Sequence, residues 1–240
     1  LTGMIRYFDT NTYYRQPSVV HDLEWQGPIT LEEYRFAAHN SSVPVKAVII
    51  GPYSLAKQSL WPHYSSLRAV TLDLAAILNM EARALEAAGA PIIQIDEPAI
   101  LFNKQDFDLF AESMSILSDV ISTSLALYSC FGDIREITEE YFALPFDTIG
   151  LDFTRGSPNY AALAKFPSSK TLGFGIMNAR NTRLETVDEV ISGIDNAIDH
   201  ISGDKIVVSP SCGLEFLPRR NAYRKLQRMV EAVTTVREKE

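Results

Sequence analysis

From residue 45 onward the chain repeats one pattern of apolar and polar positions. A short apolar run is followed by a polar or Gly/Pro turn and then by apolar residues at helical spacing, which is typical of βα units around a parallel sheet. The predicted strands cover residues 46–50, 92–95, 125–128, 148–151, 172–176 and 205–208. Helices are predicted over residues 72–88, 106–120, 134–142 and 159–165, and along two apolar stripes: Val187, Val190, Ile191, Ile194, Ile198 and Ile201, then Ala222, Leu226, Met229, Val230 and Val233.

These units are two short of the eight that close a TIM-type β/α barrel. An open doubly wound sheet is the alternative, but no Gly-rich phosphate-binding turn follows any predicted strand. We therefore predict a single domain over residues 1–240, a (β/α)8 barrel lacking its first two βα units. Residues 1–44 hold an inserted loop and a strand pair, and residues 45–240 hold the βα units. The missing strands are expected ahead of Leu1, which would leave the strands at residues 46–50 and 205–208 as exposed edges.

Composition narrows the class of protein. A hydrophobic content of 46% allows a sizeable core. No apolar run approaches the roughly 20 residues that a bilayer requires, and no secretory leader opens the chain, so we expect no membrane partner. Two cysteines make no disulfide framework, which favours the cytoplasm. A net charge of -8 argues against nucleic acid as a partner.

Polar side chains follow most of the predicted strands. In a parallel barrel these positions converge on one mouth, where substrates bind. Acids, guanidinium groups and thiols gathered there suit a small zwitterion such as an amino acid. The candidate substrate-binding residues are Asp96, Glu97, Asp152, Arg155, Asn178 and Arg180, and the two thiols are Cys130 and Cys212.

Two expectations concern the charged members of this set. Asp96 and Glu97 are expected to line the mouth with ionisation perturbed by mutual repulsion, although capping the next helix or pairing with barrel arginines is the alternative. Arg155 and Arg180 are expected to point to the same mouth, within about 10 Å of these acids or Asp152, because unpaired buried acids are costly.

Several segments resemble the cobalamin-independent methionine synthase family, in the same order. The string IIQIDEPAI at residues 92–100 is similar to the Q-I-D-E-P-A motif of both halves of that family. The strings FDTN (8–11), GPYS (51–54), LDFTRG (151–156), NARN (178–181) and SPSC (209–212) resemble its amino-terminal half, while CGLEFLPRR (212–220) also resembles its carboxy-terminal half. The amino-terminal half is the better match on these motifs.

The resemblance implies methyl transfer to homocysteine or a related thiol in methionine biosynthesis, with a methylated folate or another methyl donor as co-substrate. It gives Asp96 the role of holding the amino group of homocysteine. In the family's catalytic half a His-x-Cys pair, a glutamate and a later cysteine hold zinc. Here Cys130 and Cys212 match the two thiolates, but Tyr128 stands in place of the histidine and Asp152 in place of the glutamate.

Two alternatives therefore stay open for the metal and for the function. Two thiolates and a carboxylate could bind zinc if water or a substrate sulfur completed the set, or both cysteines could be ordinary buried residues. The chain is then either a methyltransferase, alone or as an enzyme subunit, or a non-catalytic module equivalent to the amino-terminal half that binds substrate or docks on a separate catalytic barrel. Stoichiometric zinc would favour catalysis.

Overall fold

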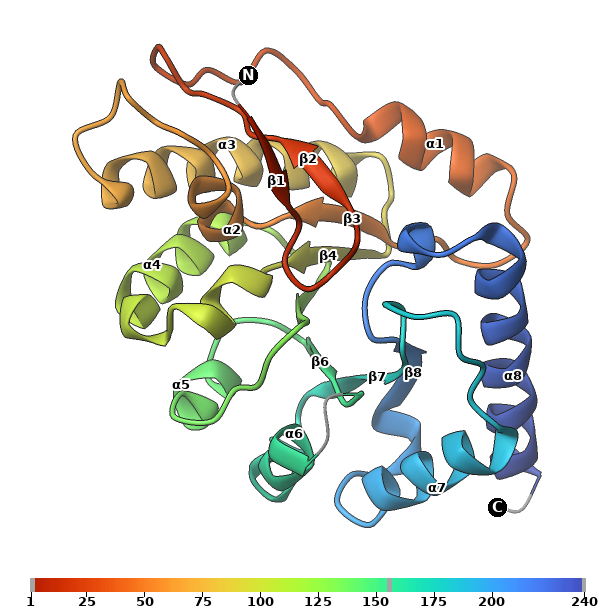
Figure 1. The fold of residues 1–240 in the computed structure, drawn as a ribbon. Coiled ribbons are helices and arrows are strands. Elements are labelled where there is room, and N and C mark those ends of the chain that lie inside the picture. Colours follow the sequence, from red (N-terminus) through yellow and green to blue (C-terminus); the bar gives the residue numbers. More distant parts are fainter. Residues whose placement is uncertain (1–2, 155–156, 239–240) are drawn as a thin grey trace. The chain divides into compact units, whose positions relative to one another are not determined.

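The structure, a computed structural model, describes residues 3–154 and 157–238 (Figure 1). All the predicted strands are present, in one sheet with the sequential order β3-β4-β5-β6-β7-β8. Their bounds are β3 Ala47–Ile50, β4 Ile92–Asp96, β5 Ser124–Ser129, β6 Thr148–Asp152, β7 Thr171–Met177 and β8 Ile206–Pro210. The pairs β3–β4, β4–β5 and β7–β8 are parallel.

This is an α/β arrangement of the β/α barrel type, because the strands follow one another in sequential parallel order. The strands that the structure describes do not close into a ring, since β3 and β8 end the order. Neither a closed six-stranded barrel nor a sheet in another order is formed, in agreement with the sequence analysis. The position of two further strands ahead of Leu1 stays a prediction.

Helices follow the strands as predicted, with two additions. The predicted helices are α3 Leu67–Ala87, α4 Phe107–Ser118, α5 Thr138–Phe142, α6 Ser157–Ala162, α7 Val187–Ile198 and α8 Arg219–Arg237. The predicted strand pair near the start of the chain is β1 Met4–Arg6 and β2 Tyr13–Arg15, in a sheet of its own. The additions are α1 Leu31–His39 and α2 Pro52–Lys57. Within the described ranges, no helix is both long and apolar enough to cross a membrane.

Local chemistry explains both additional helices. Glu32 and Glu33 occupy the first turn of α1, where negative charge stabilises the helix. Thr30 does not cap α1 with its side chain, because its hydroxyl donates to Glu81 at 2.7 Å. Pro52 stands at the first position of α2, where its fixed φ suits a helix start and its missing N–H costs nothing. The Gly-Pro dipeptide therefore begins a helix here, and does not merely end a strand.

By internal contacts the described chain divides into two compact units. The first is built mainly on Arg15–Ser129 and carries β3, β4 and β5; its helix α3 packs against α2, α4 and β4 (Figure 1). The second comprises Ile5–Tyr14, Cys130–Phe142 and the residues from Ile149 on, and its helix α7 packs against β7, β8 and α8. Helix α7 begins with a capping box between Thr186 and Glu189.

Gly51 is required by a close approach. A Cβ on Gly51 would overlap the Glu97 side chain, which is fully buried and cannot swing away. We expect Gly51→Ala to lower the free energy of unfolding by about 1–3 kcal/mol, as overpacking does. Chemical denaturation measures the change, and Gly3→Ala is the control, since a Cβ on Gly3 meets nothing within 4 Å. Equal losses in the two variants would contradict the steric argument.

Candidate functional site

In the first unit, the neighbouring acids Asp96 and Glu97 at the end of β4 lie in different environments. Glu97 is 0% exposed and lies against the start of α2. Its Oε1 accepts from the Tyr53 N–H at 2.9 Å, and its Oε2 accepts from the Ser54 N–H at 2.8 Å and the Ser54 hydroxyl at 2.6 Å. Glu97 thus satisfies free N–H groups at the first turn of α2, a helix that precedes it in the chain. It does not cap the next helix, since its side chain makes no capping hydrogen bond at the 3-10 helix Pro98–Phe102.

The pKa of Glu97 is raised to about 8, chiefly by burial. The hydrogen bonds from Ser54 and Tyr53 oppose this rise, and the charge of Asp96 adds to it least. The expectation of perturbed ionisation is therefore confirmed for Glu97, but its cause is desolvation more than mutual repulsion. The expectation that the Glu97 side chain lines the barrel mouth is corrected, because the carboxylate is enclosed against α2.

Asp96 is half-buried and has polar neighbours of its own. Its Oδ1 accepts from the Gln94 side-chain amide at 2.7 Å. The Lys46 ammonium lies 4.5 Å from the centre of the Tyr128 ring, a cation–π distance. Burial lowers the pKa of Lys46, while the Asp96 charge opposes that shift. Tyr128, which stands at the position of a metal-binding histidine in the resemblance, is therefore adjacent to a protein cation.

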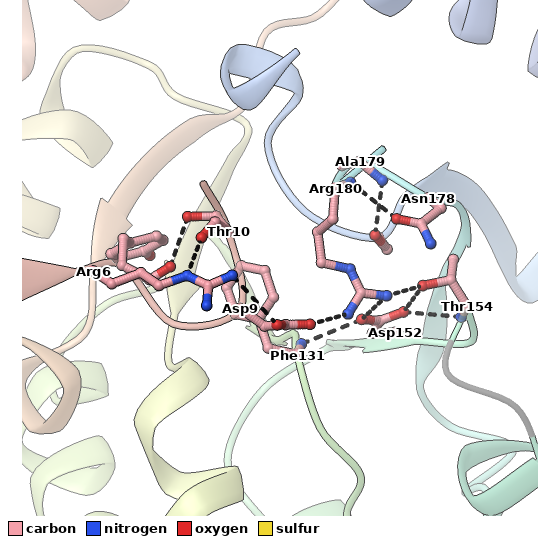
Figure 2. Close-up of polar contacts among 11 residues, drawn as sticks. Arg6, Asp9, Thr10, Phe131, Asp152, Thr154, Asn178, Ala179 and Arg180 are labelled. Atoms are coloured by element: carbon pink, nitrogen blue, oxygen red, sulfur yellow. Dashed lines mark hydrogen bonds and ion pairs between the residues drawn. The ribbon is translucent and has the colours of Figure 1, made fainter. Parts of the chain in front are cut away.

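In the second unit, Asp152 and Arg180 meet at the ends of β6 and β7 (Figure 2). The Arg180 guanidinium lies 3.8 Å from Asp152 Oδ2, donates to the Thr154 hydroxyl at 2.7 Å and donates to Asp9 at 3.2 Å. Asp152 also accepts from the Thr154 N–H at 2.9 Å and the Phe131 N–H at 3.3 Å. The expectation that Arg180 lies within about 10 Å of one of the named acids is confirmed; Arg155 lies outside the described residues.

Asn178 holds the loop after β7 in place. Its side-chain oxygen accepts from the Arg180 N–H at 2.9 Å, and its own N–H donates to Glu185 at 3.0 Å. Glu185 pairs with Lys225, whose side chain is fully buried, at 2.7 Å. This ion pair joins α8 to the loop that carries Asn178 and Arg180. An Arg180 set between two acids on a braced loop suits recognition of a small charged molecule.

Comparison with known families places this geometry in context. The sequence profile described as "Cobalamin-independent synthase, Catalytic domain" matches residues 3–235, nearly the whole chain. The chain belongs to the cobalamin-independent methionine synthase family. The matching profile is that of the catalytic domain, whereas the motifs at residues 8–11 and 51–54 favoured the amino-terminal half. Because this match extends over nearly the whole chain, it outweighs the short motifs that favoured the amino-terminal half.

Relatives of the methionine synthase family support the same assignment. The methionine synthase of Pyrococcus abyssi is 33% identical over 228 residues, covering 95% of this chain and 68% of its own length. That of Saccharolobus solfataricus is 34% identical over 240 residues, covering 98% of this chain and 71% of its own length. The chain is thus a methionine synthase-family protein, of the cobalamin-independent methyltransferase type.

Solved structures share the fold. A B12-independent methionine synthase from Shewanella sp. W3-18-1, in complex with selenomethionine, superposes with a TM-score of 0.89 at 22% identity. The comparison covers 99% of this chain and 74% of that one. A methyltransferase from Methanosarcina mazei gives a TM-score of 0.68 at 16% identity, covering 92% of this chain and 72% of that one. At these identities the comparisons support the arrangement of strands and helices.

The residues of this methionine synthase-family chain do not fit the zinc set of the family. Among the described residues, Cys130 and Cys212 form no disulfide, and both are half-buried. Among the described residues, no three His, Cys, Asp or Glu side chains are placed to hold a metal ion together. The oxygens of Asp152, at the glutamate position, are instead engaged by Arg180, Thr154 and the Phe131 N–H.

Sequence reasoning gave no site role to several residues of this family member that the structure brings into contact. Asp9 was noted within the FDTN string but not as a partner of Arg180. Ser54 and Lys46 were likewise unassigned. Lys225 carried a usable signal, since a lysine within an apolar helical stripe must find a buried partner. Its partner Glu185 lies 40 residues away, and no sequence pattern indicates that Glu185 is this partner.

Proposed function

We propose that this chain transfers a methyl group to the sulfur of homocysteine or a related amino-acid thiol, in methionine biosynthesis and in the cytoplasm. The observation that carries the proposal is the Asp152–Arg180 pair at the ends of β6 and β7, in a chain whose residues 3–235 match a catalytic-domain profile. Such a pair provides both signs of charge for an amino-acid substrate. A methylated folate or another methyl donor is the co-substrate, and residues 1–240 act as one barrel domain.

Within this proposal the substrate-binding set keeps Asp96, Asp152, Asn178, Arg180 and Arg155. Asp96 keeps the role that the resemblance implies, which is to hold the ammonium group of the substrate. For Arg180 and Arg155 the proposed role is to bind a carboxylate. Glu97, because it is enclosed against α2, would act indirectly by fixing the residues that follow β3. In the reaction the substrate sulfur forms the new bond to the methyl carbon, the donor leaves with the electrons of the broken bond, and the thiol proton is released.

Metal content is the first test of this proposal. Because the donors at Tyr128 and Asp152 depart from the zinc set, we expect freshly purified protein to contain far less than one zinc per chain. Plasma emission spectrometry measures this, with Cys130→Ser and Cys212→Ser as matched variants. Stoichiometric zinc that either serine variant loses would contradict the metal-free site and would assign Cys130 and Cys212 as its ligands.

Activity is the second test. The protein is incubated with homocysteine and a methylated folate, and methionine is quantified. Asp152→Asn is expected to reduce the rate roughly tenfold or more, because it removes the charge that positions Arg180 while keeping the size of the side chain. Asp188→Asn, an exposed change in the first turn of α7, is the control. Equal rates for the two variants would remove Asp152 from the site.

The alternative function is a non-catalytic module that binds substrate or docks on a separate catalytic barrel. The incomplete zinc set favours this alternative, since zinc activates the thiol in the catalytic half of the family. It predicts that homocysteine binds without turnover when the chain is alone. Methionine formation by the isolated chain would exclude it.

A further inference from the structure

Helix α8 carries an exposed apolar seam beside the face with which it packs against α7 and β8 (Figure 1). In this seam Tyr223, Leu226 and Val230 are 63%, 38% and 60% exposed, and Val233 is half-buried. These four residues follow one another at intervals of three, four and three residues. Apolar side chains at such intervals are typical of a helix that packs lengthwise on a second helix. Their gathering in one seam indicates an interaction surface.

An apolar cavity of about 500 Å³ opens along one side of the seam. Side chains of α8 and β8 line it, among them Val230, Val233, Ile206 and Val207. Val207 is 49% exposed, and β8 is the last strand in the order of the described sheet. A helix seated on the seam would therefore also cover apolar groups of β8.

The charges beside the seam are divided along the length of α8. Arg220 and Arg224 lie near its start, where the first turn contains no acid, while Glu231 lies in its second half and Glu238 directly follows its last residue. Within the described residues neither Arg220 nor Glu238 forms an ion pair. Cations at the start of a helix oppose its dipole. The best partner for this surface is therefore an antiparallel helix whose acidic end meets the two arginines.

The α8 helix of a second copy has the apolar spacing that this surface requires. When two copies are aligned antiparallel about a twofold axis between Leu226 and Val230, Leu226 of each copy faces Val230 of the other. In the same alignment Tyr223 faces Val233 of the second copy. Each contact therefore occurs twice, as in any isologous interface.

The same alignment brings opposite charges together. Arg220 comes within about one helical turn of the level of Glu238 of the second copy. The negative end of each helix dipole also lies beside the arginines of the other copy. At the two ends of the seam Arg219 faces Arg237 of the second copy, and this like-charge contact limits the affinity.

We infer that α8 is a self-association surface, on which the seam of one copy packs antiparallel against the seam of a second copy. The interface is centred on one helix from each copy, so it is at the small end of specific interfaces, and we expect a dissociation constant of roughly 10–100 µM. The inference is independent of the methyl transfer proposed above.

The experiment is sedimentation velocity of the whole chain at concentrations from about 1 to 500 µM, a range that brackets the expected dissociation constant. We expect the mean mass to rise reversibly from that of one copy to that of two. A chain that stays monomeric throughout this range overturns the inference. Growth beyond two copies also overturns it, because an isologous contact closes at the dimer.

Val230→Asp tests the apolar part of the seam. It places a charge against Leu226 of the second copy at both symmetric positions, and should weaken association roughly hundredfold. Val43→Asp is the matched control, because it makes the same change at a residue that is 67% exposed and lies outside α8. Circular dichroism checks that both variants fold. Association that Val230→Asp leaves unchanged, or that both variants weaken equally, overturns the inference.

An exchange of charges tests the antiparallel alignment. Arg220→Glu and Glu238→Lys each turn two attractive pairs into two repulsive ones, and each alone should weaken association roughly tenfold at low salt. An equal mixture of the two variants should recover the affinity of the unchanged protein, because the new acid of one variant then meets the new lysine of the other. These exposed changes decide the question if Val230→Asp does not fold. A mixture that associates no more tightly than either variant alone overturns the inference.

Discussion

Replacing Lys225 with methionine lowers the free energy of unfolding by about 3–5 kcal/mol, the cost of leaving a buried charge without its partner. Lys225 is fully buried in α8 and donates to both oxygens of Glu185, at 2.7 and 3.0 Å, and to the Arg183 carbonyl. Methionine fills a similar volume, so the loss reports the charge and not a cavity. Urea denaturation followed by circular dichroism measures it.

Two further variants make this result specific. Arg228→Met, on the same helix, removes a pair with Glu231 in which both side chains are about half exposed, and should change stability by less than about 1 kcal/mol. Glu185→Gln combined with Lys225→Met removes both charges but keeps an acceptor for the Asn178 N–H, and should recover part of the loss. A double variant as unstable as Lys225→Met would show that the unpaired Glu185 charge is not the cause.

The second large effect is a fall in stability as the pH rises through neutrality. The pKa of Glu97 is about 8 in the folded protein and 4.5 ordinarily, so the folded state holds a proton that the unfolded state loses between these values. The stabilisation is fully present below about pH 4.5 and is lost as the pH rises through 8. Within that window the free energy of unfolding should fall by roughly 1.4 kcal/mol per pH unit from this group, several kcal/mol in all.

Chemical denaturation at about one-unit steps across this window, at pH 5.5, 6.5, 7.5 and 8.5, tests the expected fall in stability. The Glu97→Gln variant is measured for comparison. Because glutamine cannot ionise, the free energy of unfolding of the Glu97→Gln variant should change less with pH. The variant can still be less stable at every pH, because the glutamine amide places a donor against the N–H groups of α2. The acids whose pKa is lowered, such as Glu81 and Glu86, lose their contribution only in more acidic solution. Parallel curves for the two proteins would assign the slope to other groups.

The strands were predictable because each is a short, nearly continuous apolar run between turn residues. The structure extends β4 by one residue, to Asp96, and β5 by one at each end. Helix α8 was predicted less well. Its buried residues are Lys225, Ala232 and Val236, whereas Leu226 and Val230, placed on the predicted stripe, are 38% and 60% exposed. The prediction from apolar positions alone placed the buried face of α8 wrongly, because this helix buries Lys225, which pairs with Glu185.

Residue types predicted which polar residues follow the strands, but not the direction in which each side chain points. Asp152, Asn178 and Arg180 follow their strands as expected. Successive side chains of a strand point to opposite faces, so Asp96 and Glu97 could not both point into one mouth. Glu97 continues the alternation of Ile93 and Ile95, which are fully buried, and is enclosed as they are. Asp9, by contrast, meets Arg180 across 171 residues, a separation at which no local pattern gives a signal.

Gly51 and Glu97 share one volume, and this limits the order in which the two positions can change during evolution. A side chain at position 51 is acceptable only after residue 97 has become shorter, because Glu97 fills the space that a Cβ would need. A shorter residue at 97, however, no longer reaches the Tyr53 and Ser54 N–H groups. Each single change is therefore unfavourable in the other's present context. Such mutual dependence keeps the glycine and the glutamate together through sequence drift that alters their surroundings.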